Sequence, residues 1–534
     1  MDRPAPASPV LATRIMDMLK TRGVKRIFGI PGGGSSLALM EAARRSGIEF
    51  ILTRTETAAA IMAAVTGEIT GTLGVLLTGI GPGAASAVNG IAYAYLEKSP
   101  VILITDGPAS SPHQALDQNA VFKPVTKAQG RLTPESGIAD FANAIVSAMT
   151  PPRGPVHLDL TARDASAPVP APTDMPFAAA PPVPDPKLLE KARALLAGSQ
   201  KPVILTGLEA RQGDAPLALR FLANALACPV LTSLKAGGVL PASHAGFAGL
   251  FTGAAAESEI IHSADLVVAF GLDPIEIIPG RWPYESPVLD ICAAEATPPP
   301  YEPACRIIGS LSQIAEALAP VLTPGAWTAE EIEQARRGIA ENFALDGKGH
   351  TAQSVIEAAA NLAPPGTRLS VDAGAHMFAT LAFWPASEPF GVLKSNGLST
   401  MGYALPAAIA SSLEEPDRHV VAVTGDGGLM MCLGELATAK EHGCNITVIV
   451  INDATLSLID IKQQRQQYES CGVRTSGIDL AACAGAMGCR AWRVEADEDL
   501  AEVWNKAFAA KGPALIDVVA DAEGYGDQLT RIRG

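Results

Sequence analysis

The sequence predicts an α/β protein made of three doubly wound, parallel-sheet domains. Three observations lead to this fold class. Short apolar runs alternate with segments of helical period, which is typical of parallel sheets covered on both faces. Two proline-rich stretches interrupt that alternation. The chain has 534 residues, too many for a single hydrophobic core.

Composition excludes several classes of protein. The formal net charge of -15 argues against a nucleic-acid partner, because phosphate binding requires clustered Lys and Arg. The 8 cysteines form no C-x-x-C pair, so we expect reduced thiols rather than a disulfide framework or a zinc site. No apolar run is long enough to cross a bilayer, and the first ten residues lack the apolar region of a secretory signal. We therefore expect a cytoplasmic protein without a membrane partner.

The first predicted domain covers residues 1–165. We expect helices at 10–22, 37–45 and 58–68, and a further helix opened by Gly81-Pro82-Gly83. The apolar runs at 26–28, 50–52, 74–77 and 101–105 are the expected strands.

A Pro- and Ala-rich stretch at 165–186 is the expected linker to a central domain at 186–325. Its expected strands are 201–205, 229–231 and 265–270, and the pattern breaks again at the three prolines 298–300. The last predicted domain covers 350–534. Its expected strands are 368–371, 419–424, 446–451 and 514–519.

Two carboxylates follow neighbouring strands of the last domain. The run 420–424 leads directly into Gly425-Asp426-Gly427-Gly428, and a helix is expected from about 433 to 442. The next strand ends at Asn452-Asp453. Ligands of open α/β sheets bind at the carboxyl ends of strands, and glycines let the backbone approach a phosphate. Two carboxylates beside a diphosphate require a cation, and oxygen ligands favour magnesium or calcium.

Gly-Asp-Gly alone is more often an ordinary tight turn. The spacing of 27 positions between Asp426 and Asp453 is more specific. It resembles the thiamine-diphosphate (ThDP) signature, in which Gly-Asp-Gly is followed after a fixed interval by Asn-Asn. Asp453 stands in place of the second Asn and keeps an oxygen ligand. The resemblance implies that Mg²⁺ is held by Asp426, Asp453 and the main-chain carbonyl of Thr455.

Further motifs in the expected order extend this resemblance over essentially the whole chain, and they are most similar to the acetolactate-synthase-like branch of the family. The segments that carry it are Phe28-Gly29-Ile30-Pro31-Gly32-Gly33, Thr53-Arg54-Thr55-Glu56, Gly81-Pro82-Gly83 with Asn89, 94–100, Gln114 with 122–127, Asp372-Ala373-Gly374-Ala375-His376, and 396–402.

The resemblance assigns roles to single residues. Glu56 is the catalytic glutamate that shares a proton with the pyrimidine ring of ThDP, and Gln114 faces the substrate. Met401 supports the bent shape of the cofactor, and the backbone at Ser399 and Met401 holds the pyrimidine edge. His376 and the amides of Gly427 and Gly428 hold the diphosphate. The remaining expected contacts with the cofactor or the second reaction step are Gly81, Asn89, Leu458 and Ile459.

Assembly also follows from the resemblance. The glutamate domain of one chain meets the diphosphate domain of another in this family, so a homodimer is the expected minimum and a homotetramer the expected form. Two departures, Thr55 where a histidine is common and Ala375 where a glutamine is common, argue against acetolactate synthase proper. The segment 270–274 does not resemble the FAD-contacting pattern, and we expect no FAD.

The leading hypothesis is a ThDP- and Mg²⁺-dependent enzyme that decarboxylates a 2-oxo acid, with aldehyde release or carboligation. The alternative is a lyase that acts on an acyloin (a 2-hydroxy ketone) or a 2-hydroxyacyl-CoA without decarboxylation. A non-catalytic ThDP-binding sensor is a more remote alternative, since a sensor needs no Glu56. A nucleotide-binding dehydrogenase is disfavoured, because no G-x-G-x-x-G follows the first strand.

Overall fold

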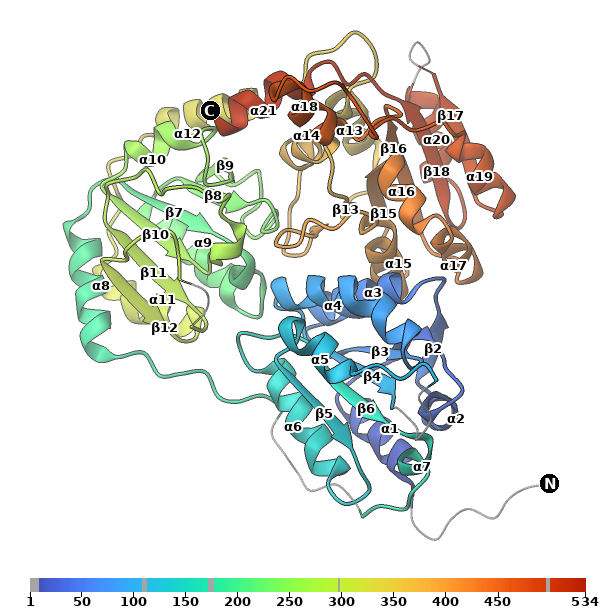
Figure 1. Cartoon of the computed structure of the whole chain (residues 1–534). Helices are drawn as coiled ribbons and strands as arrows, with labels where there is room; N and C mark the ends of the chain where they lie inside the picture. Colours follow the sequence, from blue (N-terminus) through green and yellow to red (C-terminus); the bar gives the residue numbers. More distant parts are fainter. Residues whose placement is uncertain (1–8, 108–112, 171–176, 296–297, 496–499) are drawn as a thin grey trace. The chain divides into compact units, whose positions relative to one another are not determined.

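The computed structural model describes residues 9–107, 113–170, 177–295, 298–495 and 500–534. Two compact units are formed by the chain: Met1–Ala180 with Ile409–Glu414, and Pro181–Ala408 with Glu415–Gly534. Three six-stranded sheets, one in the first unit and two in the second, have helices on both faces (Figure 1). Every strand pair within these sheets is parallel. The predicted fold class is therefore confirmed.

The first sheet has the order β2-β1-β3-β4-β6-β5. Its strands are β1 (Arg26–Ile30), β2 (Glu49–Leu52), β3 (Gly74–Thr78), β4 (Val101–Asp106), β5 (Ala128–Leu132) and β6 (Val156–Leu160). The helices are α1 (Leu11–Thr21), α2 (Ser35–Ser46), α3 (Glu56–Thr70), α4 (Pro82–Leu96), α5 (Gln118–Phe122), η1 (Lys123–Val125), α6 (Gly137–Met149) and α7 (Ala162–Ala165). Side chains from α1, α2, α6 and the central strands form one core.

The second sheet has the order β12-β11-β10-β7-β8-β9. Its strands are β7 (Pro202–Thr206), β8 (Val230–Ser233), β9 (Phe247–Phe251), β10 (Leu266–Phe270), β11 (Val288–Cys292) and β12 (Cys305–Ile308). The helices are α8 (Pro186–Gly198), η2 (Leu208–Arg211), α9 (Ala215–Leu226), α10 (Ser258–His262), η3 (Pro274–Glu276), α11 (Leu311–Leu318), η4 (Ala319–Val321) and α12 (Ala329–Phe343).

The third sheet has the order β14-β13-β15-β16-β18-β17. Its strands are β13 (Arg368–Val371), β14 (Val392–Lys394), β15 (Val420–Gly425), β16 (Ile446–Asn452), β17 (Arg490–Val494) and β18 (Ala514–Val519). The helices are α13 (Ala352–Leu362), α14 (His376–Phe383), α15 (Ala404–Glu414), α16 (Asp426–Cys432), α17 (Glu435–Glu441), α18 (Ser457–Arg465), α19 (Leu480–Ala486), α20 (Leu500–Phe508) and α21 (Tyr525–Arg533).

Local details differ from the prediction at several places. The helix expected from about 433 to 442 is α17, and a separate short helix, α16, which was not predicted, precedes it and begins at Asp426. Strands β5, β6, β9, β11, β12, β14 and β17 were not predicted. The expected linker contains no helix or strand between 177 and 185, and its residues 171–176 lie outside the described residues, as do residues 1–8.

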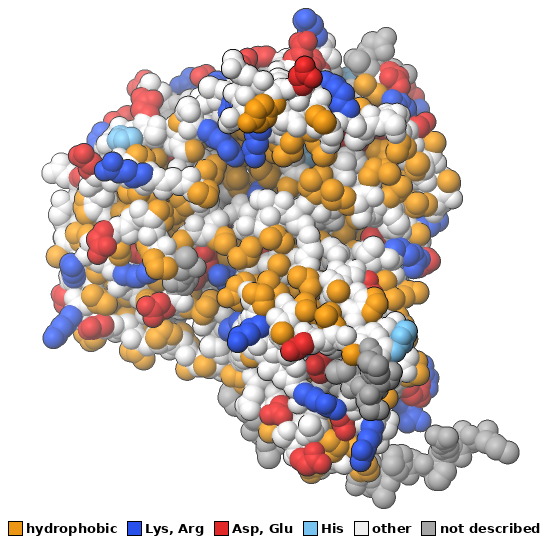
Figure 2. Space-filling view, in the orientation of Figure 1, with side chains coloured by type: hydrophobic (Ala, Val, Ile, Leu, Met, Phe, Trp, Pro, Cys, Tyr) orange, Lys and Arg blue, Asp and Glu red, His pale blue; other side chains and the backbone are white. Residues whose placement is uncertain are grey.

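Two further features concern the distribution of charge on the surface and the length of the helices. Acidic and basic side chains are interspersed on the face shown in Figure 2, without a continuous basic tract. None of the helices in the described ranges is both long and apolar enough to span a membrane.

Candidate active site

A cavity of about 230 Å³ lies in the second unit at the carboxyl ends of β13, β15 and β16. The strand order reverses between β13 and β15, so this is the topological switch point where open α/β sheets bind ligands. Every cofactor- or metal-binding residue predicted in the last domain lines it: His376, Ser399, Met401, Asp426, Gly427, Gly428, Asp453, Thr455, Leu458 and Ile459. The cavity is therefore assembled from separate motifs that the sequence predicted one by one.

Asp426 and Asp453 form an acidic pair in this cavity. One Asp426 oxygen accepts a hydrogen bond from the Thr475 hydroxyl at 2.9 Å, and Asp453 accepts from the Thr455 N–H at 3.0 Å and from the Ser457 hydroxyl. Burial raises the pKa of both carboxyls, and the neighbouring Asp426 charge adds to the rise at Asp453, whose pKa is about 6. A divalent cation between them would remove this mutual repulsion.

In the described parts of the chain, no three His, Cys, Asp or Glu side chains cluster in a way that could hold a metal. A site built from two carboxylates and one main-chain carbonyl does not need such a cluster, since a hard cation such as Mg²⁺ keeps several water ligands.

Gly427 and Gly428 are required by close packing at the floor of the cavity. A methyl group on Gly428 would lie 2.5 Å from Asp372 Oδ2 and 2.7 Å from the Thr424 hydroxyl, and one on Gly427 would lie 2.8 Å from Leu456. The same group on Gly427 would lie 3.5 Å from the Met401 side chain. A Cβ at either position would therefore collide with neighbouring protein side chains, which accounts for glycine at both.

His376 presents a polar atom without a protein partner. Its side chain is 5% exposed, and no hydrogen-bond partner reaches Nε2 within the described residues. Burial lowers the pKa of His376 to about 4, so the imidazole is neutral at pH 7. A neutral imidazole with Nε2 protonated can donate one hydrogen bond to an anionic ligand oxygen. This orphan donor fits the predicted diphosphate contact.

Two lining or supporting residues were not predicted. Asp372 follows β13 and accepts hydrogen bonds from the Gly402 N–H at 2.9 Å and the Thr424 hydroxyl at 2.9 Å, so it joins the Ser399–Gly402 loop to β15. Tyr525 at the start of α21 lines the cavity with a buried hydroxyl that has no partner in the described structure. Asp372 belongs to the Asp372–His376 segment that carries the family resemblance, but no role was predicted for it. No local sequence pattern indicated Tyr525.

The remaining predicted residues belong to the first unit. Glu56 is the first residue of α3, where the Thr55 side chain caps the helix by accepting from the Ala58 N–H at 3.1 Å. A methyl group on Gly83 would lie 3.1 Å from Glu56 Oε1, so the start of α4 approaches the carboxylate closely. Gly81 adjoins Gln114, with 2.4 Å between a methyl group on Gly81 and the Gln114 carbonyl oxygen. Asn89 lies on the exposed side of α4.

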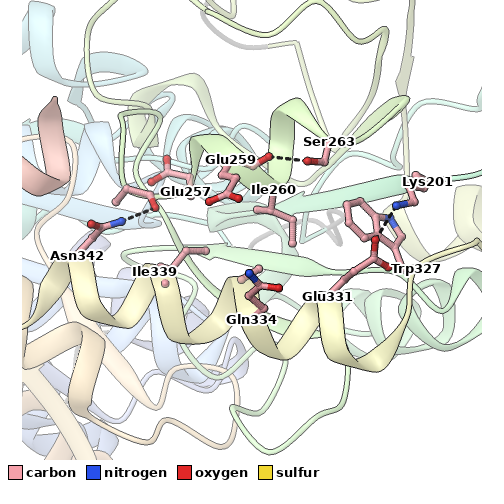
Figure 3. Close-up of a pocket in the computed structure, with 13 residues that line it drawn as sticks. Lys201, Glu257, Glu259, Ile260, Ser263, Trp327, Glu331, Gln334, Ile339 and Asn342 are labelled. Atoms are coloured by element: carbon pink, nitrogen blue, oxygen red, sulfur yellow. Dashed lines mark hydrogen bonds and ion pairs between the residues drawn. The ribbon is translucent and has the colours of Figure 1, made fainter.

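A second cavity, of about 280 Å³, lies between α10 and α12 in the second unit (Figure 3). Its polar groups largely satisfy one another. Lys201 pairs with Glu331 at 2.7 Å and lies over the Trp327 ring, and the Asn342 amide donates to the Ala256 carbonyl at 3.0 Å. These pairings indicate helix-to-sheet packing rather than a binding site.

Comparison with known proteins agrees with the geometry. Three domains described for thiamine pyrophosphate enzymes match the chain: the N-terminal TPP binding domain at residues 10–125, the central domain at 189–318 and the C-terminal TPP binding domain at 372–518. The chain belongs to the thiamine pyrophosphate enzyme family. The predicted family is thereby confirmed, and every residue that lines the cavity except Tyr525 lies within the C-terminal TPP binding domain.

Relatives that match nearly the whole chain indicate which branch of the family it belongs to. An acetolactate synthase of Bacillus subtilis (strain 168) is 29% identical over 97% of this chain and 94% of the relative. The catabolic acetolactate synthase of Raoultella terrigena is 30% identical over 96% and 95%. The large subunit of acetolactate synthase isozyme 1 of Escherichia coli (strain K12) is 29% identical over 95% and 93%. The chain is thus a ThDP-dependent enzyme of the acetolactate-synthase-like group, acting on carbon–carbon bonds.

Proposed function

We propose that this enzyme uses ThDP and Mg²⁺ to decarboxylate a 2-oxo acid and to join the remaining carbon unit to a second carbonyl compound. One observation carries this proposal: Asp426, Asp453 and the unpaired Nε2 of His376 converge on one cavity at the switch point of the sheet. The names of the relatives support 2-oxo-acid chemistry with carboligation.

The residues of the cavity fit both groups. Asp426, Asp453 and the Thr455 carbonyl would hold Mg²⁺, since carboxylate and carbonyl oxygens are its preferred ligands. The amides of Gly427 and Gly428 and the Nε2–H of His376 would donate to the diphosphate, and the Met401 side chain, close over Gly427, would support the bound cofactor.

Bound ThDP supplies the nucleophilic carbon and the electron sink of the reaction. The protein supplies proton transfer and orientation. Glu56 would hold a proton against the pyrimidine nitrogen, which a half-buried carboxyl at a helix start can share. Gln114 would orient the acceptor carbonyl for the second step through its amide.

The central sheet supports the proposal that no FAD is bound. Its strand order reverses between β7 and β10, and a diphosphate would be expected at the strand ends there. The buried carboxylate of Glu276 occupies this place, accepting from the Leu208 N–H at 2.6 Å and the Asp273 N–H at 3.1 Å. These main-chain donors are therefore not free for a phosphate. A purified enzyme should lack the flavin absorption band and gain none on incubation with FAD.

The first experiment is turnover of the stripped enzyme with ThDP and Mg²⁺ added back, on a panel of 2-oxo acids that begins with pyruvate. We expect cofactor-dependent release of carbon dioxide, with acetolactate among the products from pyruvate. Glu56→Gln should reduce turnover by about 100-fold or more while ThDP still binds. Binding of ThDP without carbon dioxide release from any acid would reject this proposal and point to acyloin or 2-hydroxyacyl-CoA cleavage.

A further inference from the structure

A buried amide connects two strands of the first unit to the turn beside the predicted catalytic residues. The Gln118 side chain, at the start of α5, is 1% exposed. Its Nε2 donates to Asp159 Oδ1 at 2.6 Å and lies 3.1 Å from the Thr105 hydroxyl, and its Oε1 accepts from the Gly81 N–H at 2.9 Å. One side chain thus satisfies the Gly81 amide and links it to the ends of β4 and β6.

The orientation of this amide is dictated by its partners. Asp159 also accepts from the Thr105 hydroxyl at 2.6 Å and from the Asn119 amide at 3.0 Å. Burial opposes ionisation, but hydrogen bonds from His157, Thr105 and Gln118 hold the pKa of Asp159 below its ordinary value. An ionised carboxylate only accepts hydrogen bonds, so Nε2 of Gln118 must face Asp159 and Oε1 must face Gly81.

The turn held in this way lies between Glu56 and Gln114. Gly81 has a φ of +61°, and Gln114, the residue packed against it, has a φ of +58°. Gly83, two residues further along, is the position that approaches the Glu56 carboxylate. Positive φ at a non-glycine residue persists only where its surroundings enforce it. A shift of the Gly81 backbone would therefore release the backbone strain at Gln114.

We propose that Gln118 is a positioning residue, which fixes the Gly81 turn through its main-chain N–H and thereby keeps Gln114 in place for capture of the second carbonyl compound. The assignment of that step rests on the proposed function. The geometric part, that Gln118 fixes the turn, stands on the contacts alone. Loss of the Gln118 amide should therefore impair carboligation more than decarboxylation, because Glu56 is the first residue of α3, and the Thr55 side chain caps that helix without the help of this amide.

Two variants test the inference. Both alter a side chain that donates a hydrogen bond to Asp159, but only one of the two side chains also bonds to Gly81. Gln118→Met keeps the volume of the side chain and removes its hydrogen bonds. Asn119→Ala is the matched control, because among the described residues the Asn119 side chain bonds to Asp159 and to His157 at 3.1 Å and has no hydrogen bond to Gly81. Both are compared with wild type as full-length enzyme with ThDP and Mg²⁺.

Two readouts separate positioning from general stability. Amide hydrogen exchange of the peptide containing 79–83 should accelerate about tenfold or more in Gln118→Met and stay at the wild-type rate in Asn119→Ala. The ratio of acetolactate to carbon dioxide from pyruvate should fall several-fold in Gln118→Met only. Equal behaviour of the two variants in either readout would overturn the inference.

Gln118→Glu provides a pH-dependent version of the same test. When protonated, a glutamic acid can still donate to Asp159 and accept from Gly81, whereas the ionised form has no donor. The exchange rate at 79–83, taken as a ratio to that of wild type at the same pH, should therefore fall towards one as the pH is lowered, and a ratio that does not change with pH would contradict the inference. If wild type shows no ThDP-dependent turnover, the proposed function fails, and the exchange measurements still decide whether Gln118 fixes the turn.

Discussion

At the scale of single residues, Asp453 distinguishes this chain from the Asn-Asn form of the ThDP signature. Its position at the end of β16 brings a second charge beside Asp426. Either an aspartate or an asparagine offers an oxygen to a hard cation, so the position tolerates both, but an apolar side chain there would remove a ligand.

We predict that Asp453→Ala weakens Mg²⁺-dependent binding of ThDP by about tenfold or more, whereas Asp453→Asn changes it by only a few-fold. The measurement is calorimetric titration of ThDP at a series of Mg²⁺ concentrations. Ser457→Ala is a useful comparison, because it removes a hydrogen bond to Asp453 but no ligand. If ThDP binding by Asp453→Ala depended on the Mg²⁺ concentration as it does in wild type, Asp453 would not be a metal ligand.

Residues at strand ends could be predicted from the sequence, and residues that act through distant packing could not. Asp426 and Asp453 were found because the carboxyl ends of parallel strands share one edge of the sheet. Tyr525 and Gln118 carry no such local signal. Their importance depends on which groups the folded chain leaves without a partner or brings within hydrogen-bond distance, and a one-dimensional pattern does not contain that information.

At the scale of elements, α16 shows how tertiary structure overrides propensity. The sequence Asp426-Gly427-Gly428 is a poor helix former, and α16 was therefore not predicted, whereas the helix predicted at 433–442 is α17. In the structure α16 starts at Asp426, and Asp372 and Thr424 pack so closely against Gly428 that they leave space for backbone alone. Short strands such as β12 and β14, with four and three residues, were missed for lack of length.

This packing predicts a large contrast between two helical glycines. Gly428→Ala would place a methyl group 2.5 Å from Asp372 Oδ2, and we expect loss of ThDP binding together with a lower melting temperature. Gly485→Ala in α19 has nothing within 4 Å of the new methyl group and should stabilise slightly, by about 0.5–1 kcal/mol. Thermal unfolding with and without ThDP measures both effects. If the Gly428→Ala protein bound ThDP with wild-type affinity, the proposed close packing around Gly428 would be wrong.

At the scale of the whole molecule, buried carboxyls of the central sheet link stability to pH. Glu209 is partly exposed as a residue, and its carboxylate accepts from the Ala293 N–H at 2.7 Å. Burial is the main cause that raises the pKa of Glu209 to about 8, with further contributions from Asp273, Asp290 and Glu276. Because the folded-state pKa exceeds the ordinary value of 4.5, the folded protein binds more protons than the unfolded chain between these pH values.

The unfolding free energy should therefore decrease as the pH rises from about 5 to 8. Glu209→Gln keeps an acceptor for Ala293 and should make this decrease less steep. Glu331→Gln is the control, since Glu331 pairs with Lys201 and has a pKa lowered to about 2, which acts only at more acidic pH. Melting temperatures of the three proteins across this pH range check the prediction, which fails if Glu209→Gln and wild type show the same slope.

Assembly can be tested by mixing two inactive chains. We propose a homodimer as the minimum active form and a homotetramer as the full assembly, with Glu56 of one chain serving the Asp426 site of another. A dimer of one Glu56→Gln chain and one Asp426→Asn chain then contains one site with both defects and one site with none.

Random exchange of subunits from an equal mixture should restore about a quarter of wild-type activity. If each site were built within one chain, every site in the mixture would carry a defect and no activity would return. Purification through two different tags after co-expression selects the mixed dimers, in which one site of two is intact, so that turnover of pyruvate should then be about half of wild type. The same preparation with two Glu56→Gln chains gives the background.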